Sequence, residues 1–359
     1  MTRATPSREI AIPRLLHVAT DCLADVARLL DGSGFDTTHV LVGSGGGPSL
    51  ALAEQVIDGL RSSGVEVVHA SWLQGRLEQA AATAALIIEE DVTLAVAVGG
   101  GRVIDTVKLA AARTRTDFLS VPTTMSNDGI SSPVASMTCK DGRRRSYPAA
   151  MPAGIVVDVG VVGNAPVRTL QAGIGDLVSN LTAVLDWQLA DRLGHEPFDA
   201  FSAMISESAA RPVLDVTDLA SPETHELVAK GLLQSGLAMA AAGTSRPCSG
   251  AEHLISHSLD ELLGESAAMH GEQVALGCLV SAAAHGSPLL ATLQRMFAGL
   301  ELPTEPAHLG VSEGRLVEAI AGAPALRPDR HTILSEISLD PEDIESVLAR
   351  AFTPAEQPA

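Results

Sequence analysis

The chain has 359 residues, enough for two domains with a hydrophobic core each, and 46% of these residues are hydrophobic while 3% are aromatic. With 24 Lys and Arg residues against 43 Asp and Glu residues, the formal net charge of −19 argues against nucleic acids and anionic membranes as partners. The N-terminus is polar and no apolar run reaches the roughly 18 residues of a membrane span, so we expect a cytoplasmic protein without a signal peptide.

The first 165 residues show short apolar segments in alternation with segments of helical periodicity. An apolar pattern at helical spacing predicts a first helix over residues 15–31. Predicted strands then cover residues 39–43, 65–70, 94–98 and 118–121, and predicted helices cover residues 49–60 and 76–89 and a segment that ends near residue 113. This α/β alternation is typical of a parallel sheet with helices on both faces, whose ligands bind at the carboxyl ends of the strands.

Three consecutive glycines, Gly99, Gly100 and Gly101, separate the strand at residues 94–98 from the helix that follows. A turn without Cβ atoms lets a phosphate approach the main chain, and the start of a helix presents free N–H groups to it. An ordinary tight turn is the alternative, although one or two glycines would suffice for that. The stretch therefore predicts a phosphate-binding turn, without indicating which phosphate compound binds.

Two more loops are expected at the same edge of the sheet. Gly43-Ser-Gly-Gly-Gly-Pro48 is similar to a dinucleotide-binding fingerprint, but proline takes the last glycine position and no carboxylate follows the next strand. It predicts either a pyrophosphate contact or a turn that supports one edge of a nucleotide. The second loop, residues 122–129, follows the strand at 118–121, so all three loops can meet at one crevice.

A β-hairpin is expected around the turn Asp141-Gly142, and the strand at residues 154–158 follows it. The hairpin carries a basic cluster, Arg143–Arg145. Such a cluster is ordinarily a solvated surface. In this acidic chain, beside the expected crevice, it is also a candidate for binding a substrate phosphate.

Strand patterns end near residue 165, and the rest of the chain predicts helices with short Gly and Pro breaks. The predicted helices are 167–172, 176–193, 197–209, 223–242, 250–263, 270–284, 288–298, 311–321 and 341–351. We therefore expect an α/β domain over residues 1–165 and an all-helical domain over residues 166–359.

Histidines in the helical part have the spacing of metal ligands. His253 and His257 are four residues apart, so they share one face of a helix, and His270 begins another predicted helix. Asp176, a residue that also suits a helix N-cap, supplies a carboxylate. Each residue alone has an ordinary structural explanation. Together they predict a catalytic metal site with three protein ligands, and the scattered cysteines (Cys22, Cys139, Cys248, Cys278) fit reduced thiols.

Five motifs then occur in order along the chain: Gly99-Gly-Gly-Arg-Val-Ile-Asp-x2-Lys108, Pro122-Thr-Thr-x-Ser-Asn-Asp-Gly-Ile-x-Ser-Pro133, Ala172-Gly-Ile-Gly-Asp-Leu177, Ser249-Gly-Ala-Glu-His-x3-His257 and His270-Gly-Glu-Gln-Val274. Together they resemble the sn-glycerol-1-phosphate dehydrogenases, in the superfamily of glycerol dehydrogenase, iron-containing alcohol dehydrogenases and dehydroquinate synthase. The resemblance covers residues 40–334 and implies a Rossmann-like dinucleotide-binding domain followed by an all-helical metal-binding domain. One departure is Met125-Ser-Asn127 before Asp128, where many relatives have Ala-Ser-His or Ala-Ser-Met.

The resemblance also implies a role for each matching residue. The NAD(P) pyrophosphate would lie on Gly99, Gly100, Gly101 and Arg102, with Asp105 closing the motif and Thr123, Thr124, Ser126 and Ser132 lining the cofactor. Asp128 would hold a substrate hydroxyl, and His257 would face the substrate and help to protonate it. Asp176, His253 and His270 would bind Zn2+ or another divalent metal such as Ni2+ or Fe2+.

The implied reaction is the reduction of dihydroxyacetone phosphate, or a close phosphorylated or phosphonate analogue, at C2 to sn-glycerol 1-phosphate. The hydride would come from nicotinamide C4, with the carbonyl polarised by the metal. Lys140 and Arg143–Arg145 are candidates for the substrate phosphate, and a homo-oligomer is expected. Three alternatives stay open: a sugar-phosphate cyclase with bound NAD like dehydroquinate synthase, a glycerol dehydrogenase-like enzyme for an unphosphorylated polyol, and a non-catalytic nucleotide sensor. The preference between NAD and NADP is open too.

Overall fold

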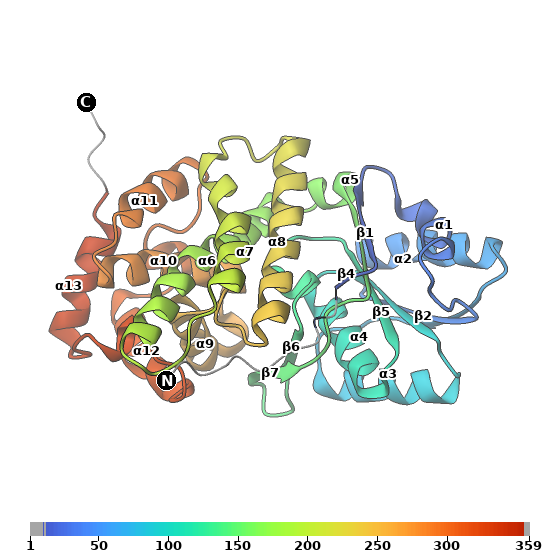
Figure 1. Cartoon of the computed structure of the whole chain (residues 1–359), viewed down its shortest axis with the longest axis horizontal. Helices are drawn as coiled ribbons and strands as arrows, with labels where there is room; N and C mark the ends of the chain where they lie inside the picture. The colour runs from blue at the N-terminus through green and yellow to red at the C-terminus, as the bar shows by residue number, and fades with distance from the viewer. Residues whose placement is uncertain (1–9, 11, 355–359) are drawn as a thin grey trace.

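Six parallel strands form the central sheet of the computed structural model, which describes residue 10 and residues 12–354 (Figure 1). The spatial order is β1-β8-β5-β4-β2-β3. The strands are β1 (Leu15–Ala19), β2 (His39–Ser44), β3 (Glu66–Ala70), β4 (Leu94–Gly99), β5 (Asp117–Pro122) and β8 (Gly154–Asp158). Every pairing among them is parallel, so all their carboxyl ends meet at one edge of the sheet.

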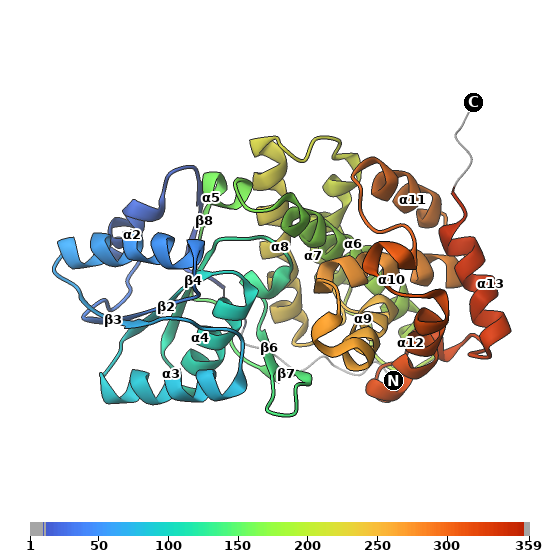
Figure 2. The same ribbon diagram turned by 180° about the vertical axis from the view of Figure 1, so that it is seen from behind.

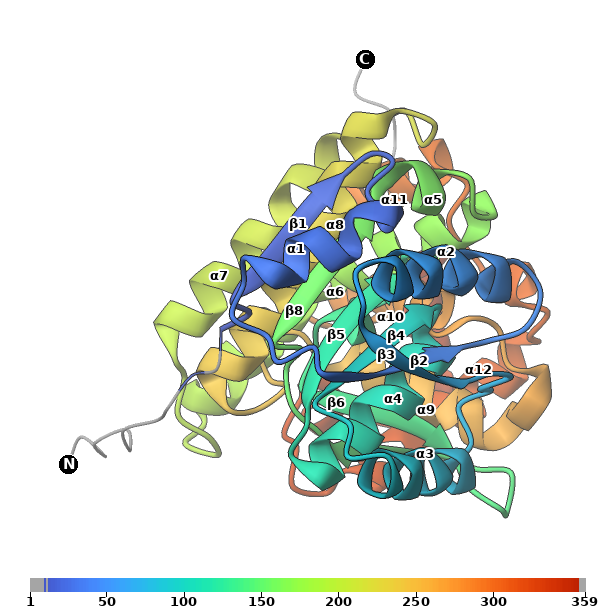
Figure 3. The same cartoon turned by 90° about the vertical axis from the view of Figure 1, so that its right-hand side faces the viewer.

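Helices cover both faces of this sheet, which confirms the predicted α/β class. Helices α1 (Val26–Asp31) and α2 (Pro48–Ser62) lie on one face, and α3 (Leu77–Glu89) and α4 (Gly101–Thr114) lie on the other (Figure 3). Strand β2 shows the cause. Val40 and Val42 pack with α1 and α2, whereas Leu41 packs with α3 and α4, because successive side chains of a strand point to opposite faces.

The predicted helix over residues 15–31 is wrong in its first half. Strand β1 lies there, followed by a 3-10 turn, η1 (Leu23–Asp25), and the short α1. Leu15, Leu16 and Val18 also fit a helical period, but β1 pairs in parallel with β8, which comes much later in the chain. This distant partner decides the conformation of a segment whose own pattern is ambiguous.

The predicted hairpin is confirmed. Strands β6 (Val134–Thr138) and β7 (Arg144–Pro148) pair antiparallel, and a 3-10 turn, η2 (Asp128–Ile130), precedes them. The hairpin lies where the sheet meets the large group of helices (Figure 2). It is therefore placed to contribute side chains to any site at that junction.

After β8 the described residues form helices and no further strand. These helices are α5 (Val159–Gly163), α6 (Val167–Arg192), α7 (Ala200–Ala210), η3 (Arg211–Asp215), α8 (Pro222–Ala242), α9 (Ala251–Leu263), η4 (Gly264–Ser266), α10 (His270–Ala284), α11 (Leu289–Gly299), η5 (Pro306–Leu309), α12 (Glu313–Leu326), η6 (Ile333–Ser335) and α13 (Pro341–Phe352). The helices predicted over 167–172 and 176–193 are one helix, α6, because the glycines between them allow close packing without ending the helix. No described helix combines the length and apolarity needed to cross a bilayer.

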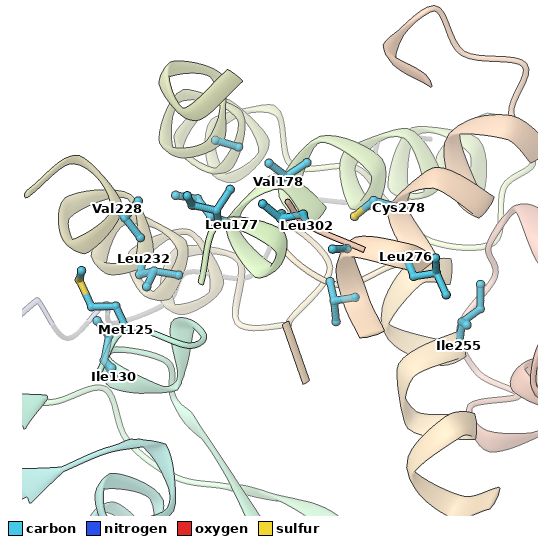
Figure 4. Close-up of a cluster of buried hydrophobic side chains, with 14 of the residues drawn as sticks. Met125, Ile130, Leu177, Val178, Val228, Leu232, Ile255, Leu276, Cys278 and Leu302 are labelled. Atoms are coloured by element: carbon cyan, nitrogen blue, oxygen red, sulfur yellow. The ribbon is translucent and has the colours of Figure 1, made fainter. Parts of the chain in front are cut away.

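One apolar cluster joins the sheet to the helices. Met125 and Ile130, from the segment after β5, lie against Val228 and Leu232 of α8, next to Leu177 of α6 (Figure 4). All four cysteines are buried and unpaired, as predicted. The division into two domains at residue 165 stays a prediction, since this cluster is shared by both parts.

Candidate active site

Loops at the carboxyl ends of β2, β4 and β5 are hydrogen-bonded to one another. The Thr123 N–H donates to the Gly99 carbonyl oxygen at 3.0 Å, which links the β5 loop to the end of β4. Ser49 Oγ donates to the Val98 carbonyl oxygen at 2.8 Å and accepts from the Gly45 N–H at 3.1 Å, which links β4 to the β2 loop. The three loops predicted to meet at one crevice therefore do lie together.

The first two glycines of the turn after β4 have little room for a side chain. A Cβ on Gly99 would lie 2.7 Å from Val103, and one on Gly100 would lie 3.0 Å from the Thr124 hydroxyl. Helix α4 begins at Gly101, and no side chain caps it. Its first N–H groups are therefore left without a side-chain partner, which is the geometry that binds a phosphate.

The other predicted cofactor residues divide into two groups. Thr123, Thr124 and Ser126 are partly exposed on the loop beside this turn, and Arg102 is exposed on the first turn of α4. Ser132 and Asp105, in contrast, are buried and engaged within the protein. The first group therefore lies at the surface beside the glycine turn, whereas Ser132 and Asp105 are covered by the protein.

Lys108 is a support that the sequence analysis did not identify. Its side chain is fully buried, and Nζ donates to Asp105 Oδ1 at 2.9 Å and to the carbonyl oxygens of Gly129 and Val134 at 2.7 Å each. Asp105 Oδ2 in turn accepts from the Ser136 N–H at 3.0 Å. All three N–H donors of the Lys108 ammonium group are used. Their acceptors connect α4 with Gly129 of η2 and with Val134 of β6.

Three side chains from three helices meet beside these loops. Asp176 lies on α6, His253 on α9 and His270 at the start of α10, and one ligand atom of each lies within 4.8 Å of the others. Asp176 Oδ1 is 3.6 Å from His253 Nε2 and 3.5 Å from His270 Nε2. This buried oxygen has no hydrogen-bond partner, although buried polar atoms nearly always have one. A carboxylate and two imidazoles that converge in this way fit a divalent cation.

The second nitrogen of each histidine is held by a neighbouring side chain. His253 Nδ1 lies 3.0 Å from Glu252 Oε1, and His270 Nδ1 lies 3.0 Å from Ser256 Oγ. Since Nδ1 is engaged, Nε2 of each ring is left to face Asp176. Neither partner was predicted from the sequence, although Glu252 stands directly before His253, and Ser256, three residues after His253, shares its face of α9.

The electrostatic environment favours a positive charge at His253. Burial opposes ionisation of its ring, but the carboxylates of Asp176 and Glu252 raise the pKa of His253 to about 10. Glu252 keeps its own pKa below the ordinary value despite its burial, because His253 and backbone N–H groups bond to it. Two carboxylates that favour a positive charge on this ring also favour a metal cation at its Nε2.

His257 and Asp128 border this cluster. The His257 ring centroid lies 6.3 Å from that of His253 and 5.8 Å from that of His270. Burial, followed by the positive charges of His253 and Arg144, lowers the pKa of His257 to about 3. Its ring is therefore neutral near pH 7.

Asp128 is bonded to Asp176 through its main chain, because its N–H donates to Asp176 Oδ2 at 2.8 Å. Burial and the negative charge of Asp176 raise the pKa of the Asp128 carboxyl to about 7. Asn127, which stands directly before Asp128, caps η2: its Oδ1 accepts from the Gly129 N–H at 2.9 Å. The loop after β5 is thus tied both to the glycine turn and to the metal-ligand cluster.

Helices α6 and α10 approach closely because both have glycine at the contact. A Cβ on Gly175 would lie 2.4 Å from the Gly271 carbonyl oxygen, and one on Gly271 would lie 1.9 Å from the Ala172 carbonyl oxygen. Asp176 and His270 are the chain neighbours of these two glycines. The close approach therefore places the carboxylate beside the imidazole.

The basic cluster of the hairpin is divided by strand alternation. Lys140 and Arg143 are exposed near the turn, and Arg145 Nη2 bonds Asp141 Oδ2 at 2.5 Å. Arg144, on the opposite face of β7, has Nη1 4.0 Å from Asp260 Oδ2 of α9. Its positive charge also contributes to lowering the pKa of both His257 and His270.

The chain is similar in sequence to proteins of known family. A family model described as iron-containing alcohol dehydrogenase matches residues 17–166. The chain is 42% identical over 276 residues to the glycerol-1-phosphate dehydrogenase [NAD(P)+] of Thermococcus kodakarensis, covering 75% of this chain and 77% of the relative. It is 36% identical over 335 residues to that of Methanosarcina barkeri, covering 92% of each.

Solved structures share the fold at lower sequence identity. A probable glycerol dehydrogenase from Sinorhizobium meliloti has a TM-score of 0.76 and 22% identity, with 96% of this chain and 98% of that chain covered. Glycerol dehydrogenase from Schizosaccharomyces pombe also has a TM-score of 0.76 and 22% identity, with 97% and 91% covered. These structures share the arrangement of a parallel sheet followed by a large helical part.

Proposed function

This chain belongs to the iron-containing alcohol dehydrogenase family, together with the glycerol-1-phosphate dehydrogenases that it is similar to, and we propose that it reduces dihydroxyacetone phosphate to sn-glycerol 1-phosphate with NAD(P)H. The observation that carries the proposal is the unpartnered Asp176 Oδ1, which faces Nε2 of His253 and of His270 beside the glycine turn. A dinucleotide site and a metal-ligand set at one crevice fit a metal-assisted hydride transfer.

Asp176, His253 and His270 would hold the metal, which we propose to be Zn2+ because a carboxylate and two imidazoles suit it. A divalent cation there would supply Lewis-acid polarisation of the substrate carbonyl. Glu252 and Ser256 would keep Nε2 of each histidine directed at the site. The protein's own contribution is thus a fixed set of ligands on three helices that cannot move independently.

The glycine turn and the first turn of α4 would bind the pyrophosphate of NAD(P)H, which supplies the hydride. Thr123, Thr124 and Ser126 would line the cofactor on the side of the helices. Asp105 and Lys108 would act behind them, by holding η2 against α4. The loop after β5 connects the two sites, because the Thr123 N–H donates to the Gly99 carbonyl oxygen and the Asp128 N–H donates to Asp176.

Asp128 and His257 would bind the substrate next to this position. With its pKa raised to about 7, the Asp128 carboxyl is able either to accept or to donate a hydrogen bond to a substrate hydroxyl. His257, whose pKa is lowered to about 3, stays neutral. It would therefore relay a proton from solvent to the substrate through hydrogen bonds, without remaining protonated itself.

The test is NADH or NADPH oxidation on mixing the purified chain with dihydroxyacetone phosphate. We expect stoichiometric oxidation, a kcat that falls at least about 10³-fold after chelation, and recovery on adding Zn2+, because the Lewis acid contributes several kcal/mol. Full activity of the metal-free chain would contradict the metal's role. Faster turnover of dihydroxyacetone would favour a glycerol dehydrogenase-like enzyme, and phosphate release without net NADH oxidation would favour a cyclase. Cytoplasmic location and a homo-oligomer stay predictions.

Arg144 is the proposed partner of the substrate phosphate. Arg144→Gln is expected to raise the KM for dihydroxyacetone phosphate about tenfold, since a charge-assisted hydrogen bond is worth about 1.5 kcal/mol or more. Arg145→Gln is the matched control and should change KM less than about twofold, because Arg145 bonds Asp141 on the other face of the hairpin. Equal KM values for the two variants in steady-state kinetics would remove the assignment.

A further inference from the structure

Trp72 is an exposed aromatic residue at the carboxyl edge of the sheet that the proposed reaction leaves unexplained. Its side chain is 61% exposed, although burial usually stabilises an indole. Its φ of +61° is a conformation that bulky residues rarely adopt. Both the positive φ and the exposure of the indole cost free energy. We infer that the indole has a role in this position.

The loop that carries Trp72 holds it firmly in this position. The Leu73 N–H donates to the carbonyl oxygen of Ser44, the last residue of β2, at 2.9 Å. Gln79 Nε2 donates to the Trp72 carbonyl oxygen at 3.0 Å, and Gln79 Oε1 accepts from the Gln74 N–H at 2.8 Å. The ring is therefore presented by a bonded loop at the carboxyl edge of the sheet.

The six-membered ring of the indole lies against the glycine loop that follows β2. A Cβ on Gly46 would lie 2.5 Å from Cζ3 and 2.8 Å from Cε3 of Trp72, so a side chain at residue 46 would displace the ring from this position. The loop that carries Trp72 also reaches the first turn of α4, because a Cβ on Gly75 would lie 3.1 Å from Cγ of Arg102. The loop that carries Trp72 thus contacts both the glycine loop after β2 and the helix that begins at the phosphate-binding turn.

The order of the strands says which part of a dinucleotide reaches this end. The pyrophosphate would lie at the end of β4, and Asp128 and Asp176 lie on the β5 side of it. The nicotinamide must face that side, so the adenosine extends the other way, over β2 and β3. Neighbouring strands are about 4.8 Å apart, which puts β3 about 10 Å from β4 and within reach of one nucleotide.

We propose that the exposed face of Trp72 is the platform on which the adenine ring of the cofactor stacks. This inference rests on the proposed use of a nicotinamide dinucleotide. Residues 44–47 and 71–76, the two loops around the ring, contain no carboxylate that could bind the ribose hydroxyls. Stacking on the indole is then the main attraction for the adenosine, since an aromatic ring binds a base through its face.

The experiment measures binding to the full, metal-loaded chain without any turnover. The chain has two tryptophans, and the second, Trp187, is buried against Phe198. In a Trp187→Phe variant, ADP-ribose and NADH should quench the remaining Trp72 fluorescence, whereas nicotinamide mononucleotide should not. Trp72→Ala should raise the Kd for ADP-ribose and NADH about tenfold, in line with base stacking on an aromatic side chain. Trp72→Phe should recover most of that loss.

Ile88→Ala is the matched control, because Ile88 is another exposed apolar side chain, 67% accessible, at the far end of α3. It should leave every Kd unchanged. An unchanged Kd for ADP-ribose in Trp72→Ala would overturn the inference, and so would an equal rise in the Kd for reduced nicotinamide mononucleotide. Failure of the folded wild-type chain to bind NADH or NADPH would instead overturn the proposed function, and this inference with it.

Discussion

Asp176→Asn is expected to remove most of the bound metal and to lower kcat/KM at least about 10³-fold, because losing a charged ligand costs several kcal/mol. Asp176 Oδ1 is the atom that both His253 Nε2 and His270 Nε2 face, at 3.6 and 3.5 Å. An amide in its place has no negative charge and turns either a neutral oxygen or an N–H group toward the two imidazoles. The three-ligand set would be reduced to two neutral rings, which bind a divalent cation weakly.

The substitution should leave the fold in place. Asp176 Oδ2 accepts from the Asp128 N–H at 2.8 Å, and the carbonyl oxygen of asparagine can accept the same bond. The cofactor site is formed by other elements, so the Kd for NADH should stay within about twofold of the wild-type value. Metal content after dialysis, measured by elemental analysis, and NADH binding therefore separate loss of the metal from loss of the protein.

Asp191→Asn is the matched control, since Asp191 is an exposed carboxylate on the same helix, α6. It should keep one metal per chain and the wild-type kcat/KM. If Asp176→Asn also kept full metal content and turnover, the metal site proposed here would be wrong, and Asp176 would be a buried support for the Asp128 loop alone.

Much of the fold was predictable from local pattern, and the exceptions have physical causes. Strands β2, β4 and β5 are buried on both faces, so they appear as continuous apolar runs between glycine or proline turns. Strand β1 was missed because its apolar residues also fit a helix, and its partner β8 lies far along the chain. Local patterns do not contain that pairing.

The candidate site also has some features that local sequence predicts and others that depend on tertiary packing. The sequence alone predicts that His253 and His257 share a helix face, because they are four residues apart. That Asp176 and His270 meet depends on Gly175 and Gly271, whose importance appears only when two helices pack without Cβ atoms between them. The positive φ of Trp72 and the burial of Lys108 are likewise consequences of tertiary structure, which no spacing rule predicts.

The contact of α6 with α10 leads to the second strong prediction, for Gly271→Ala. The new Cβ would lie 1.9 Å from the Ala172 carbonyl oxygen and 2.8 Å from the Ser126 carbonyl oxygen. Both are backbone atoms, so no change of rotamer relieves the clash and α10 must move. We expect a loss of about 3 kcal/mol in the free energy of unfolding, at the upper end of overpacking effects. The apparent Tm, measured by scanning fluorimetry, should fall by about 4 °C.

Gly271→Ala should also weaken metal binding, although residue 271 offers no ligand. Moving the start of α10 carries His270 away from Asp176, and a ligand displaced by about 1 Å loses much of its bond to the metal. Gly314→Ala is the matched control, because it makes the same change on the exposed face of α12, where nothing lies within 4 Å. It should raise stability by up to about 1 kcal/mol and leave metal affinity unchanged, since alanine favours a helix more than glycine does. A Gly271→Ala protein with wild-type Tm and metal affinity would mean that α6 and α10 do not pack through these glycines. The position of Asp176 beside His270 would then need another cause.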